Sequence, residues 1–334
     1  MREVLLGVDV GGTTTAAGAV TAAGEVLLEE SAPTHRAGPG TAGRTIVELI
    51  ETVMRRARAE RLAVTGIGVG VPGIVDPARG TIGDEAHHVP DLMGLPLGAH
   101  LAERFGVPAF VDNDVNALAL AEHTFGLGRD ARSLVVLAPG TGFGAGIILD
   151  GRLVRGAHGF GGEFVHAPVN FAGRPCWCGG RGCLAVYASG RGIAEAGRER
   201  AATTLGAELL RLAGGDLHAI TASLVFQAAA AGDQMAGAVI DEACRALGAM
   251  IGVIVNGLNP EVVVITGGVA AAYAPLEKKV LAAAAEHAFN RALAQTRVTI
   301  VPGDKRLTMR GAAVLVLYER AARVEQDGPE TRRV

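Results

Sequence analysis

Residues 4–20 read VLLGVDVGGTTTAAGAV, and this stretch sets the expectation for the whole fold. Two apolar runs flank a pair of glycines and a run of threonines, which predicts a strand, a tight turn and a second strand. Because glycine has no side chain, backbone N–H groups in such a turn can approach phosphate oxygens. Asp9, at the end of the first strand, is placed to order a magnesium ion or its waters. The candidate phosphate contacts are Gly11, Gly12, Thr13 and Thr14.

An ordinary hairpin turn would explain the same residues, so this motif alone does not establish phosphate binding. A second copy of the motif in the chain strengthens the interpretation. Residues 133–151 read SLVVLAPGTGFGAGIILDG and repeat the order of strand, Gly-Thr-Gly turn and strand. This repeat predicts two duplicated lobes, each contributing a glycine turn to a shared cleft. In the second turn we expect Gly140, Thr141 and Gly142 to contact phosphate, with Thr141 nearest the terminal phosphates. The first turn lacks the Gly-x-Gly-x-x-Gly spacing that opens a helix, which argues against a dinucleotide-binding Rossmann unit.

The length and composition of the chain allow two domains. It has 334 residues, of which 49% are hydrophobic, and this is enough for two buried cores. We expect a small lobe formed by residues 1–118 with a C-terminal helix at about residues 308–324, and a large lobe over residues 119–307. The polar residues 325–334 are expected to form a disordered tail.

The charge pattern and the N-terminus exclude several classes of protein. The formal net charge is −3, and Lys and Arg are scattered among Asp and Glu, so no basic stripe is available for a nucleic-acid backbone. The first residues lack the features of a secretory signal, and we expect a cytoplasmic protein. The longest weakly charged stretches contain glycines and polar breaks, so no membrane span is expected.

Residues 111–117 read VDNDVNA and place two acidic side chains where a buried strand is expected to pass into a helix. Carboxylates and amides are common at such junctions as helix caps, and that role would explain Asp112 or Asn113. A second acidic residue at the helix entry, between two phosphate turns in the sequence, is better explained as a general base for an alcohol. We therefore predict Asp114 as the catalytic base and Asn113 as a hydrogen-bonding partner of a sugar.

Residues 163–183 read EFVHAPVNFAGRPCWCGGRGC and crowd one histidine with three cysteines. In a cytosolic setting such a cluster indicates a metal rather than disulfides, and it is a complete tetrahedral ligand set for zinc. Because no ligand position stays open, the zinc would be structural, holding Glu163 and His166 where a polyol can hydrogen-bond them. The alternative is three buried thiols beside an unrelated histidine. The expected zinc ligands are His166, Cys176, Cys178 and Cys183.

Residues 262–269 read VVVITGGV and predict a buried strand that ends in Gly267 and Gly268. A glycine pair at the end of a strand suits the flat face of adenine or a ribose. Turns of this kind are widespread, so the segment has weight only in combination with the other motifs.

Together these motifs resemble the ROK family (repressors, open reading frames and sugar kinases). DVGGTTT is similar to the family's first phosphate motif, VDNDVNALALAE to its catalytic segment, and GTGFGAG to its second phosphate motif. GGEFVH with CWCGGRGC is similar to its zinc signature, and VVVITGGV to its adenosine segment.

The resemblance implies an α/β protein of the actin-like ATPase/hexokinase superfold. Two RNase H-like lobes would close on MgATP and a hexose and transfer phosphate to the 6-hydroxyl, and the protein would form a homodimer or homotetramer. The implied cofactors are ATP, Mg²⁺ and structural Zn²⁺, and the implied general base is Asp114. The implied sugar contacts are Asn113, Glu163, His166, Gly73 and Asp91.

Three residues depart from the family pattern. Ala185 stands where the family usually has a glutamate that binds the sugar near C1 and C2. Asp91 stands where the family often has an asparagine, and Val165 replaces the glycine before the zinc histidine. The phosphate and base residues are intact, so these departures affect the identity of the sugar rather than the reaction.

Glucose phosphorylation is the leading interpretation, and an amino-sugar kinase is the alternative. A carboxylate at Asp91 would favour a substrate ammonium, as in kanosamine, through a charge-assisted hydrogen bond. Kinases of N-acetylmannosamine or N-acetylglucosamine belong to the same alternative. A sugar-responsive transcriptional regulator would carry a helix-turn-helix domain ahead of the first phosphate motif, and only eight residues precede Asp9. A catalytically inactive sugar sensor conflicts with the presence of Asp114.

Overall fold

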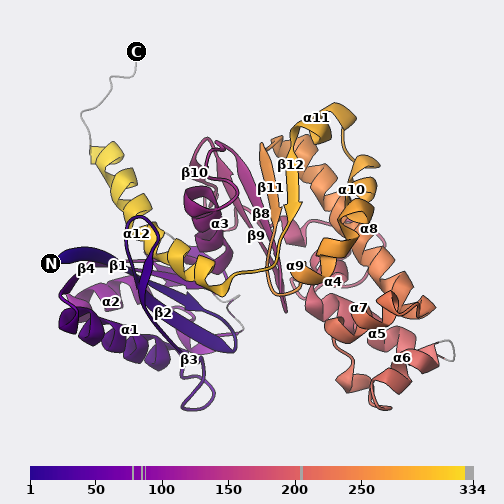
Figure 1. Cartoon of the computed structure of the whole chain (residues 1–334), viewed down its shortest axis with the longest axis horizontal. Coiled ribbons are helices and arrows are strands. Elements are labelled where there is room, and N and C mark those ends of the chain that lie inside the picture. The colour runs from indigo at the N-terminus through magenta and orange to yellow at the C-terminus, as the bar shows by residue number, and fades with distance from the viewer. Residues whose placement is uncertain (77–78, 84–85, 87, 204–205, 328–334) are drawn as a thin grey trace. The chain divides into compact units, whose positions relative to one another are not determined.

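The computed structural model describes residues 1–76, 79–83, 86, 88–203 and 206–327. The chain forms two compact units (Figure 1). Unit 1 comprises Met1–Asp130, Leu153–Gly161 and Lys305–Val334, and unit 2 comprises Ala131–Arg152 and Gly162–Asp304. The chain therefore passes from one unit to the other after residues 130, 152, 161 and 304.

The sheet of unit 1 has the strand order β3-β2-β1-β4-β7. β1 pairs antiparallel with β2, and β2 with β3, whereas β4 runs parallel to both β1 and β7. The first glycine turn connects β1 to β2, as the sequence predicts. The strands are β1 (Arg2–Val10), β2 (Thr14–Val20), β3 (Val26–Pro33), β4 (Leu62–Val71) and β7 (Ala109–Asn113).

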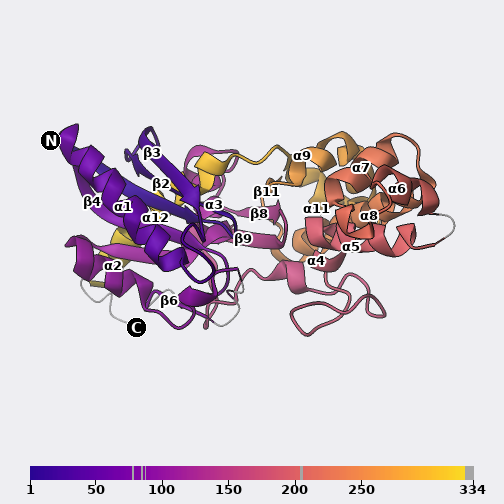
Figure 2. The ribbon, with the colours of Figure 1, turned by 90° about the horizontal axis from the view of Figure 1, so that it is seen from below.

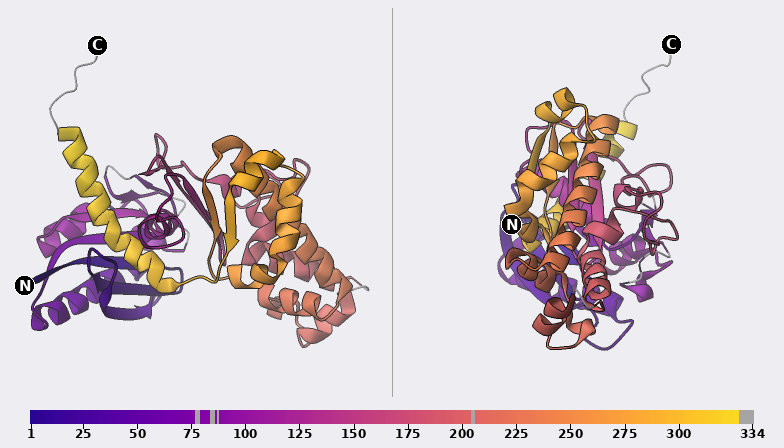
Figure 3. Two further views of the ribbon diagram at one scale, coloured as in Figure 1. Left: turned by 45° about the horizontal axis from the view of Figure 1, so that its top comes forward. Right: turned by 90° about the vertical axis from the view of Figure 1, so that its right-hand side faces the viewer.

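Helices cover both faces of this sheet. Side chains alternate along a strand, so Leu6 and Val8 point to one face, where they share a buried cluster with Ile46 of α1. Gly7 points to the other face, where a Cβ atom on this residue would stand 2.0 Å from the carbonyl oxygen of Met309 in α12. Figure 3 shows α12 running along the sheet. The helices of unit 1 are α1 (Ala42–Ala59), α2 (Leu97–Phe105), α3 (Asp114–Phe125) and α12 (Lys305–Asp327).

The sheet of unit 2 repeats this arrangement, with the strand order β10-β9-β8-β11-β12. β8 pairs antiparallel with β9 and parallel with β11, and β11 pairs parallel with β12. Strand by strand, β8 therefore corresponds to β1, β9 to β2, β11 to β4 and β12 to β7. The duplication that the two glycine turns predict is present in the strand order. The strands are β8 (Leu134–Pro139), β9 (Phe143–Leu149), β10 (Arg152–Leu153), β11 (Val262–Ile265) and β12 (Arg297–Ile300).

The helical part of unit 2 is built around α8 (Gln234–Leu258), which contacts α5 and α7 (Figure 2) and also α10 (Figure 1). The contact with α10 is close, because a Cβ atom on Gly248 would stand 2.6 Å from the carbonyl oxygen of Val280. The other α-helices are α4 (Ala185–Ala188), α5 (Gly190–Ala201), α6 (Ala207–Leu212), α7 (Ala222–Ala230), α9 (Ala270–Tyr273), α10 (Glu277–Ala285) and α11 (Asn290–Gln295). Single 3₁₀ turns are η2 (Phe164–His166), η4 (Leu217–Ala219) and η5 (Ala274–Leu276).

Several bounds differ from the expectations drawn from sequence. The boundary expected at residue 118 lies inside α3, and unit 1 continues to Asp130, because α3 packs against α12 and β4. α12 ends at Asp327, three residues into the segment expected to be a disordered tail. Residues 328–334 of that tail lie outside the described residues. Between β4 and α2 lie three short elements: β5 (Val75–Asp76), β6 (Thr81–Ile82) and η1 (Pro90–Leu92).

Within the described part of the chain, no helix combines the length and the apolar character that a membrane crossing requires.

Candidate functional site

The glycine turn of unit 1 is held from behind by threonine hydroxyl groups. The amide of Gly11 donates to the carbonyl of Thr14 at 3.0 Å, which closes the turn. The Oγ1 hydroxyl of Thr34 donates to the carbonyl of Gly11 at 2.6 Å, and the hydroxyls of Thr34 and Thr15 lie 3.0 Å apart. A Cβ atom on Gly12 would stand 3.3 Å from the side chain of His88, so a larger residue here would require a small shift of that side chain. The exposed residues of the turn are Gly12, Thr13 and Thr14.

Asp114 is the first residue of α3 and follows directly after β7. Its carboxylate lies at the positive end of the helix dipole, which favours the charged form that a base requires. Gly70 of β4 allows the helix to begin here, because a Cβ atom on Gly70 would stand 3.3 Å from the Cα atom of Asp114. Asp114 is half-buried. The passage from strand to helix that the sequence predicts within residues 111–117 is therefore present, and the helix begins at Asp114.

Asn113 is the N-cap of α3. Its Oδ1 atom accepts hydrogen bonds from the amides of Val115 at 2.8 Å and Asn116 at 3.2 Å, and its Nδ2 atom donates to the carbonyl of Gly73 at 3.0 Å. Gly73 has a φ of +102°, which favours glycine. The structure therefore places two predicted sugar contacts, Asn113 and Gly73, side by side next to Asp114, and it gives Asn113 the capping role that was the alternative.

An ion-pair cluster around the buried Asp112 supports this helix entry, and no sequence motif points to it. Asp112 is 2% exposed, and its Oδ2 atom accepts from Arg155 Nε at 2.7 Å. Arg155 also donates to Glu319 of α12 at 2.5 Å. Burial opposes the charge on Arg155, but the two carboxylates outweigh it and raise the pKa of the guanidinium. The Oδ1 atom of Asp112 accepts from the Asn113 amide at 2.7 Å, so the cluster holds the chain at the predicted base.

Asp91 lies in η1 and contacts the start of α1. Its Oδ2 atom accepts from the amide of Gly43 at 2.9 Å, which satisfies one of the free N–H groups in the first turn of that helix. Its Oδ1 atom is buried and has no hydrogen-bond partner among the described residues. Oδ2 of Asp91 therefore has a structural role, whereas Oδ1 can still accept a hydrogen bond.

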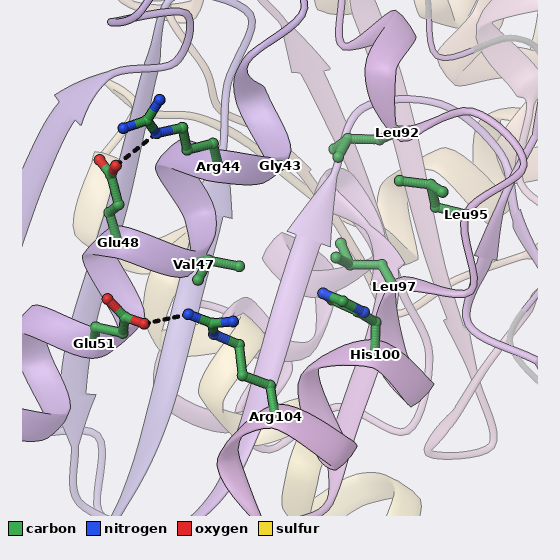
Figure 4. Close-up of a pocket in the computed structure, with 10 residues that line it drawn as sticks. All are labelled: Gly43, Arg44, Val47, Glu48, Glu51, Leu92, Leu95, Leu97, His100 and Arg104. Carbon is green, nitrogen blue, oxygen red and sulfur yellow. Dashed lines mark hydrogen bonds and ion pairs between the residues drawn. The ribbon is translucent and has the colours of Figure 1, made fainter.

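A pocket of about 460 Å³ lies between α1, the segment that follows η1, and α2 (Figure 4). Apolar side chains of Val47, Leu92 and Leu97 line it. Two ion pairs lie at its edge, Arg44 with Glu48 and Arg104 with Glu51. Within each pair the arginine and the glutamate neutralise one another, so the edge carries no net charge from these four residues. None of the predicted site residues lines this pocket.

Unit 2 brings its two glycine turns together. The amide of Gly140 donates to the carbonyl of Gly142 at 2.9 Å, which closes the Gly-Thr-Gly turn, and Thr141 is exposed at its tip. The Val269 amide, just after the Gly267-Gly268 pair, donates to the Pro139 carbonyl at 2.9 Å. Gly267 has a φ of +143°, and a Cβ atom on it would stand 2.7 Å from the same carbonyl oxygen. Gly268 is exposed. The predicted phosphate and adenosine segments of unit 2 are thus neighbours.

The histidine and three cysteines of unit 2 form one cluster. Their ligand atoms all lie within 4.8 Å of one another. His166 Nδ1 is 3.5 Å from Cys176 Sγ, and Cys178 Sγ is 3.7 Å from Cys183 Sγ. Sulfur atoms bound to one tetrahedral zinc at about 2.3 Å would be separated by roughly 3.8 Å, so the cluster fits zinc.

The protonation chemistry of this cluster also fits a metal. Burial lowers the pKa of the His166 imidazole, so this ring is neutral at pH 7 and its nitrogen can bind a cation. Burial raises the pKa of the Cys183 thiol to about 12 in the metal-free protein. A bound zinc would displace that proton and take the thiolate.

The remaining predicted sugar contacts belong to unit 2. Glu163 immediately precedes η2, and its carbonyl accepts from the His166 amide at 3.0 Å. The two residues that depart from the family pattern nearby, Val165 and Ala185, are both fully buried. The predicted sugar contacts are therefore divided: Asn113, Gly73 and Asp91 lie in unit 1, and Glu163 and His166 lie in unit 2.

Comparisons with known proteins define the class of this chain. A glucokinase from Streptomyces griseus, solved in complex with glucose and AMPPNP, is 32% identical and superposes with a TM-score of 0.73, over 93% of this chain and 98% of that one. The two mixed five-stranded sheets thus belong to an actin-like ATPase fold, and the fold class expected from the sequence is confirmed.

The family follows from the same comparisons. The model of the ROK family matches residues 5–319, and the chain belongs to that family. A glucokinase from Halalkalibacterium halodurans is 36% identical over 272 residues, which are 80% of this chain and 81% of that protein. A xylose repressor from Caldicellulosiruptor bescii is 35% identical over 246 residues, which are 72% of this chain and 60% of that longer protein. The relatives therefore include both sugar kinases and repressors.

Proposed function

We propose that this protein phosphorylates the 6-hydroxyl of a hexose with ATP, as a glucokinase does, with Asp114 as the general base. The observation that carries the proposal is the position of Asp114, half-buried at the N-terminus of α3 in the unit that also holds the first glycine turn. The similarity to a glucokinase that binds glucose and AMPPNP supports it.

The reaction assigns one task to each group of residues. The Asp114 carboxylate accepts the proton of the sugar hydroxyl as that oxygen attacks the γ-phosphorus of ATP. Amides of the two glycine turns bind phosphate oxygens, and Gly267 with Gly268 receives the adenosine. Asp9, half-buried in β1, would order a Mg²⁺ ion or its waters, and that ion would neutralise charge on the phosphates. The phosphate contacts are Gly11, Gly12, Thr13, Thr14, Gly140, Thr141 and Gly142.

The cluster of unit 2 serves the sugar indirectly. His166 uses Nδ1 towards Cys176, so its Nε2 atom is the ring nitrogen that can hydrogen-bond a sugar hydroxyl. Glu163, one turn earlier, supplies a carboxylate acceptor. A zinc ion held by His166 and the three cysteines would fix the orientation and tautomer of the histidine ring. The contacts from unit 1 are Asn113 and Gly73.

An amino-sugar kinase is the second candidate. The Oδ1 atom of Asp91, which is buried and has no partner in the part of the chain that the structure describes, favours a substrate that donates a hydrogen bond from an ammonium or an amide nitrogen. Ala185 leaves the region near C1 and C2 without the carboxylate that is usual in the family. Kanosamine, N-acetylmannosamine and N-acetylglucosamine are therefore included with glucose in the substrate panel.

Asp114→Asn tests the proposal. ADP release is measured for wild type and variant with glucose, mannose and the three amino or N-acetylated sugars. We expect kcat to fall by about three to five orders of magnitude, because the amide cannot accept the proton, while the far-UV spectrum and melting temperature stay close to wild type. Asp130→Asn, an exposed carboxylate in the same unit, is the control and should keep full activity. An active Asp114→Asn would refute the base assignment, and a wild type that is inactive on every sugar would refute the kinase.

A further inference from the structure

The joint between α4 and α5, residues 188–191, is bonded directly to the Gly-Thr-Gly turn. The amide of Gly190 donates to the carbonyl of Gly140 at 2.8 Å, and the amide of Arg191 donates to the carbonyl of Thr141 at 3.0 Å. A Cβ atom on Gly190 would stand 2.9 Å from the Gly140 oxygen, so the joint approaches too closely for a larger residue. The conformation of this turn therefore depends on the position of the joint.

The same joint also contacts the other glycine turn of unit 2. The hydroxyl of Tyr273, a fully buried residue of α9, donates to the carbonyl of Ala188 at 2.9 Å. A Cβ atom on Gly190 would stand 3.3 Å from Val269, which directly follows Gly268. The joint is thus packed against both turns that we assign to the nucleotide.

Two routes lead from the joint back to the His-Cys₃ cluster. Along the chain, α4 (Ala185–Ala188) begins directly after Cys183 and Leu184, and all its residues are buried. Through side chains, the guanidinium of Arg191 lies 4.7 Å from the centroid of the Trp177 ring, whose neighbours in sequence are Cys176 and Cys178. The Trp177 ring also meets the His166 ring edge-on, with centroids 6.5 Å apart.

We propose that Arg191 is a positioning residue that couples the metal cluster to the nucleotide turns, so that zinc and nucleotide bind with positive cooperativity. A metal that orders Trp177 and Cys183 fixes both ends of the joint, and the joint then holds the Gly140 and Thr141 carbonyls in place. Nucleotide binding loses less entropy when the turn is already ordered. By linkage, nucleotide must strengthen zinc binding by the same factor. The inference rests on the proposed function, in which these turns bind ATP.

Nucleotide affinity is the first measurement. MgADP is titrated by calorimetry into zinc-loaded wild type, Arg191→Ala and Trp177→Ala. Loss of the stacking contact is expected to raise the Kd for MgADP by roughly three- to tenfold in either variant. Trp177→Phe keeps an aromatic face and should recover most of the loss. Glucose affinity of Arg191→Ala should stay within about twofold of wild type, because Arg191 stacks on Trp177 rather than on His166.

Matched controls separate this contact from a general loss of charge or aromatic surface. Arg211→Ala removes an exposed ion pair with Glu208 on α6, and Phe171→Ala removes a ring that is 90% exposed. Glu195→Gln removes the carboxylate that Arg191 Nε contacts at 2.7 Å but keeps the stacking on Trp177. All three should bind MgADP as the wild type does.

Zinc affinity is the reciprocal measurement. Competition with a chromophoric chelator, with and without saturating MgADP, should show tighter zinc binding with nucleotide in the wild type and little difference in Arg191→Ala. Trp177 is the only tryptophan in the chain, so its fluorescence reports zinc loading in wild type and in Arg191→Ala. A change of Trp177 emission on adding MgADP is expected in the wild type and should be lost in Arg191→Ala.

Failure of the inference and failure of the proposed function give different results. A wild type that binds no MgADP contradicts the proposed function. A wild type that binds MgADP with the same affinity as Arg191→Ala, or with equal affinity whether zinc is present or removed, overturns the coupling and leaves the kinase intact. Trp177→Phe and Arg191→Ala suffice for this decision if Trp177→Ala does not fold.

Discussion

The two units share one strand order but hold their glycine turns by different means. In unit 1 a single threonine holds the turn: the backbone amide of Thr34 donates to the Thr13 carbonyl, and its side-chain hydroxyl donates to the Gly11 carbonyl. In unit 2 the turn is held by backbone amides of Gly190 and Val269, which donate to the Gly140 and Pro139 carbonyls. The repeated topology therefore determines where a turn is placed, while the contacts that stiffen it are particular to each unit.

The two units also differ in the groups that stabilise the region around the glycine turns. In unit 1, β7 leads into α3 next to the buried pair of Asp112 and Arg155. In unit 2, order near the turns comes from the His-Cys₃ cluster and the α4–α5 joint. Unit 1 thus relies on the ion pair of Asp112 and Arg155, and unit 2 on the His-Cys₃ cluster that we propose to hold zinc, so the two contributions can be tested separately.

Removal of the metal is expected to have the largest effect, confined to unit 2. Chelation should cost several kcal/mol in the stability of unit 2, because zinc binding contributes directly to folding. Hydrogen exchange followed by mass spectrometry should show lost protection in α4 and α5 and none in β1 or α12. Cys183→Ala should reproduce the loss, whereas Cys244→Ala, a buried thiol outside the cluster, should cost about 1 kcal/mol. Unchanged protection after chelation would disprove the metal assignment.

The zinc affinity should also depend on pH, and it should rise with pH because zinc must displace protons from the thiols. Burial holds the pKa of Cys183 at about 12 in the metal-free protein, so at neutral pH zinc must displace a proton. Each proton released makes the apparent affinity about tenfold higher per pH unit. Chelator competition between pH 6 and 8 should therefore show zinc binding more tightly as pH rises, and an affinity independent of pH would contradict thiolate ligation.

Breaking the buried ion pair should have the next largest effect, confined to unit 1. Arg155→Met leaves the carboxylate of Asp112 buried without its cation, which should cost about 3–5 kcal/mol by urea denaturation. Adding Asp112→Asn in the same chain should recover part of this loss, because the unpaired charge is removed. Arg132→Met is the control: its pair with Asp150 has side chains 79% and 80% exposed, and its loss should cost less than about 1 kcal/mol. Equal losses for Arg155→Met and Arg132→Met would mean that the cluster is not important to unit 1.

The smallest effect is expected at Glu122 of α3. Burial raises the pKa of this carboxyl, and the amide of Leu127, which donates to it at 2.9 Å, only partly offsets the shift. A pKa that is higher in the folded than in the unfolded state makes the folded protein lose stability as pH rises through that value. Glu122→Gln should therefore be more stable than wild type by about 1 kcal/mol at pH 8, with the gain vanishing near pH 4. Thermal denaturation at both pH values checks this, with the exposed Glu103→Gln as the control that should show no gain.

What the sequence predicts well is local in the chain. Both glycine turns, the helix entry at Asp114 and the cysteine cluster depend on residues a few positions apart, and their spacing alone indicates the chemistry. The pair of Arg155 and Asp112 joins residues 43 positions apart, and Arg155 with Glu319 joins residues 164 apart, so no pattern in the sequence points to either.

Asp91 is a second example of a contact that the sequence does not predict. The presence of an aspartate at this position does not reveal that the folded chain brings it to the start of α1. Its Oδ2 contact with Gly43 spans 48 positions. A residue type can indicate a chemical preference, but the partner that satisfies it is known only after the chain has folded.

The position of α12 has a consequence for synthesis of the chain. This helix follows the last strand of unit 2, yet it covers the face of the unit 1 sheet on which Gly7 and Gly68 lie. On a ribosome, the first strands to emerge must therefore wait for the last helix, while unit 2 is complete in sequence once residue 304 has emerged. A nascent chain halted before Lys305 would leave the part of this sheet face that α12 covers exposed to solvent, which is the kind of apolar surface that chaperones bind.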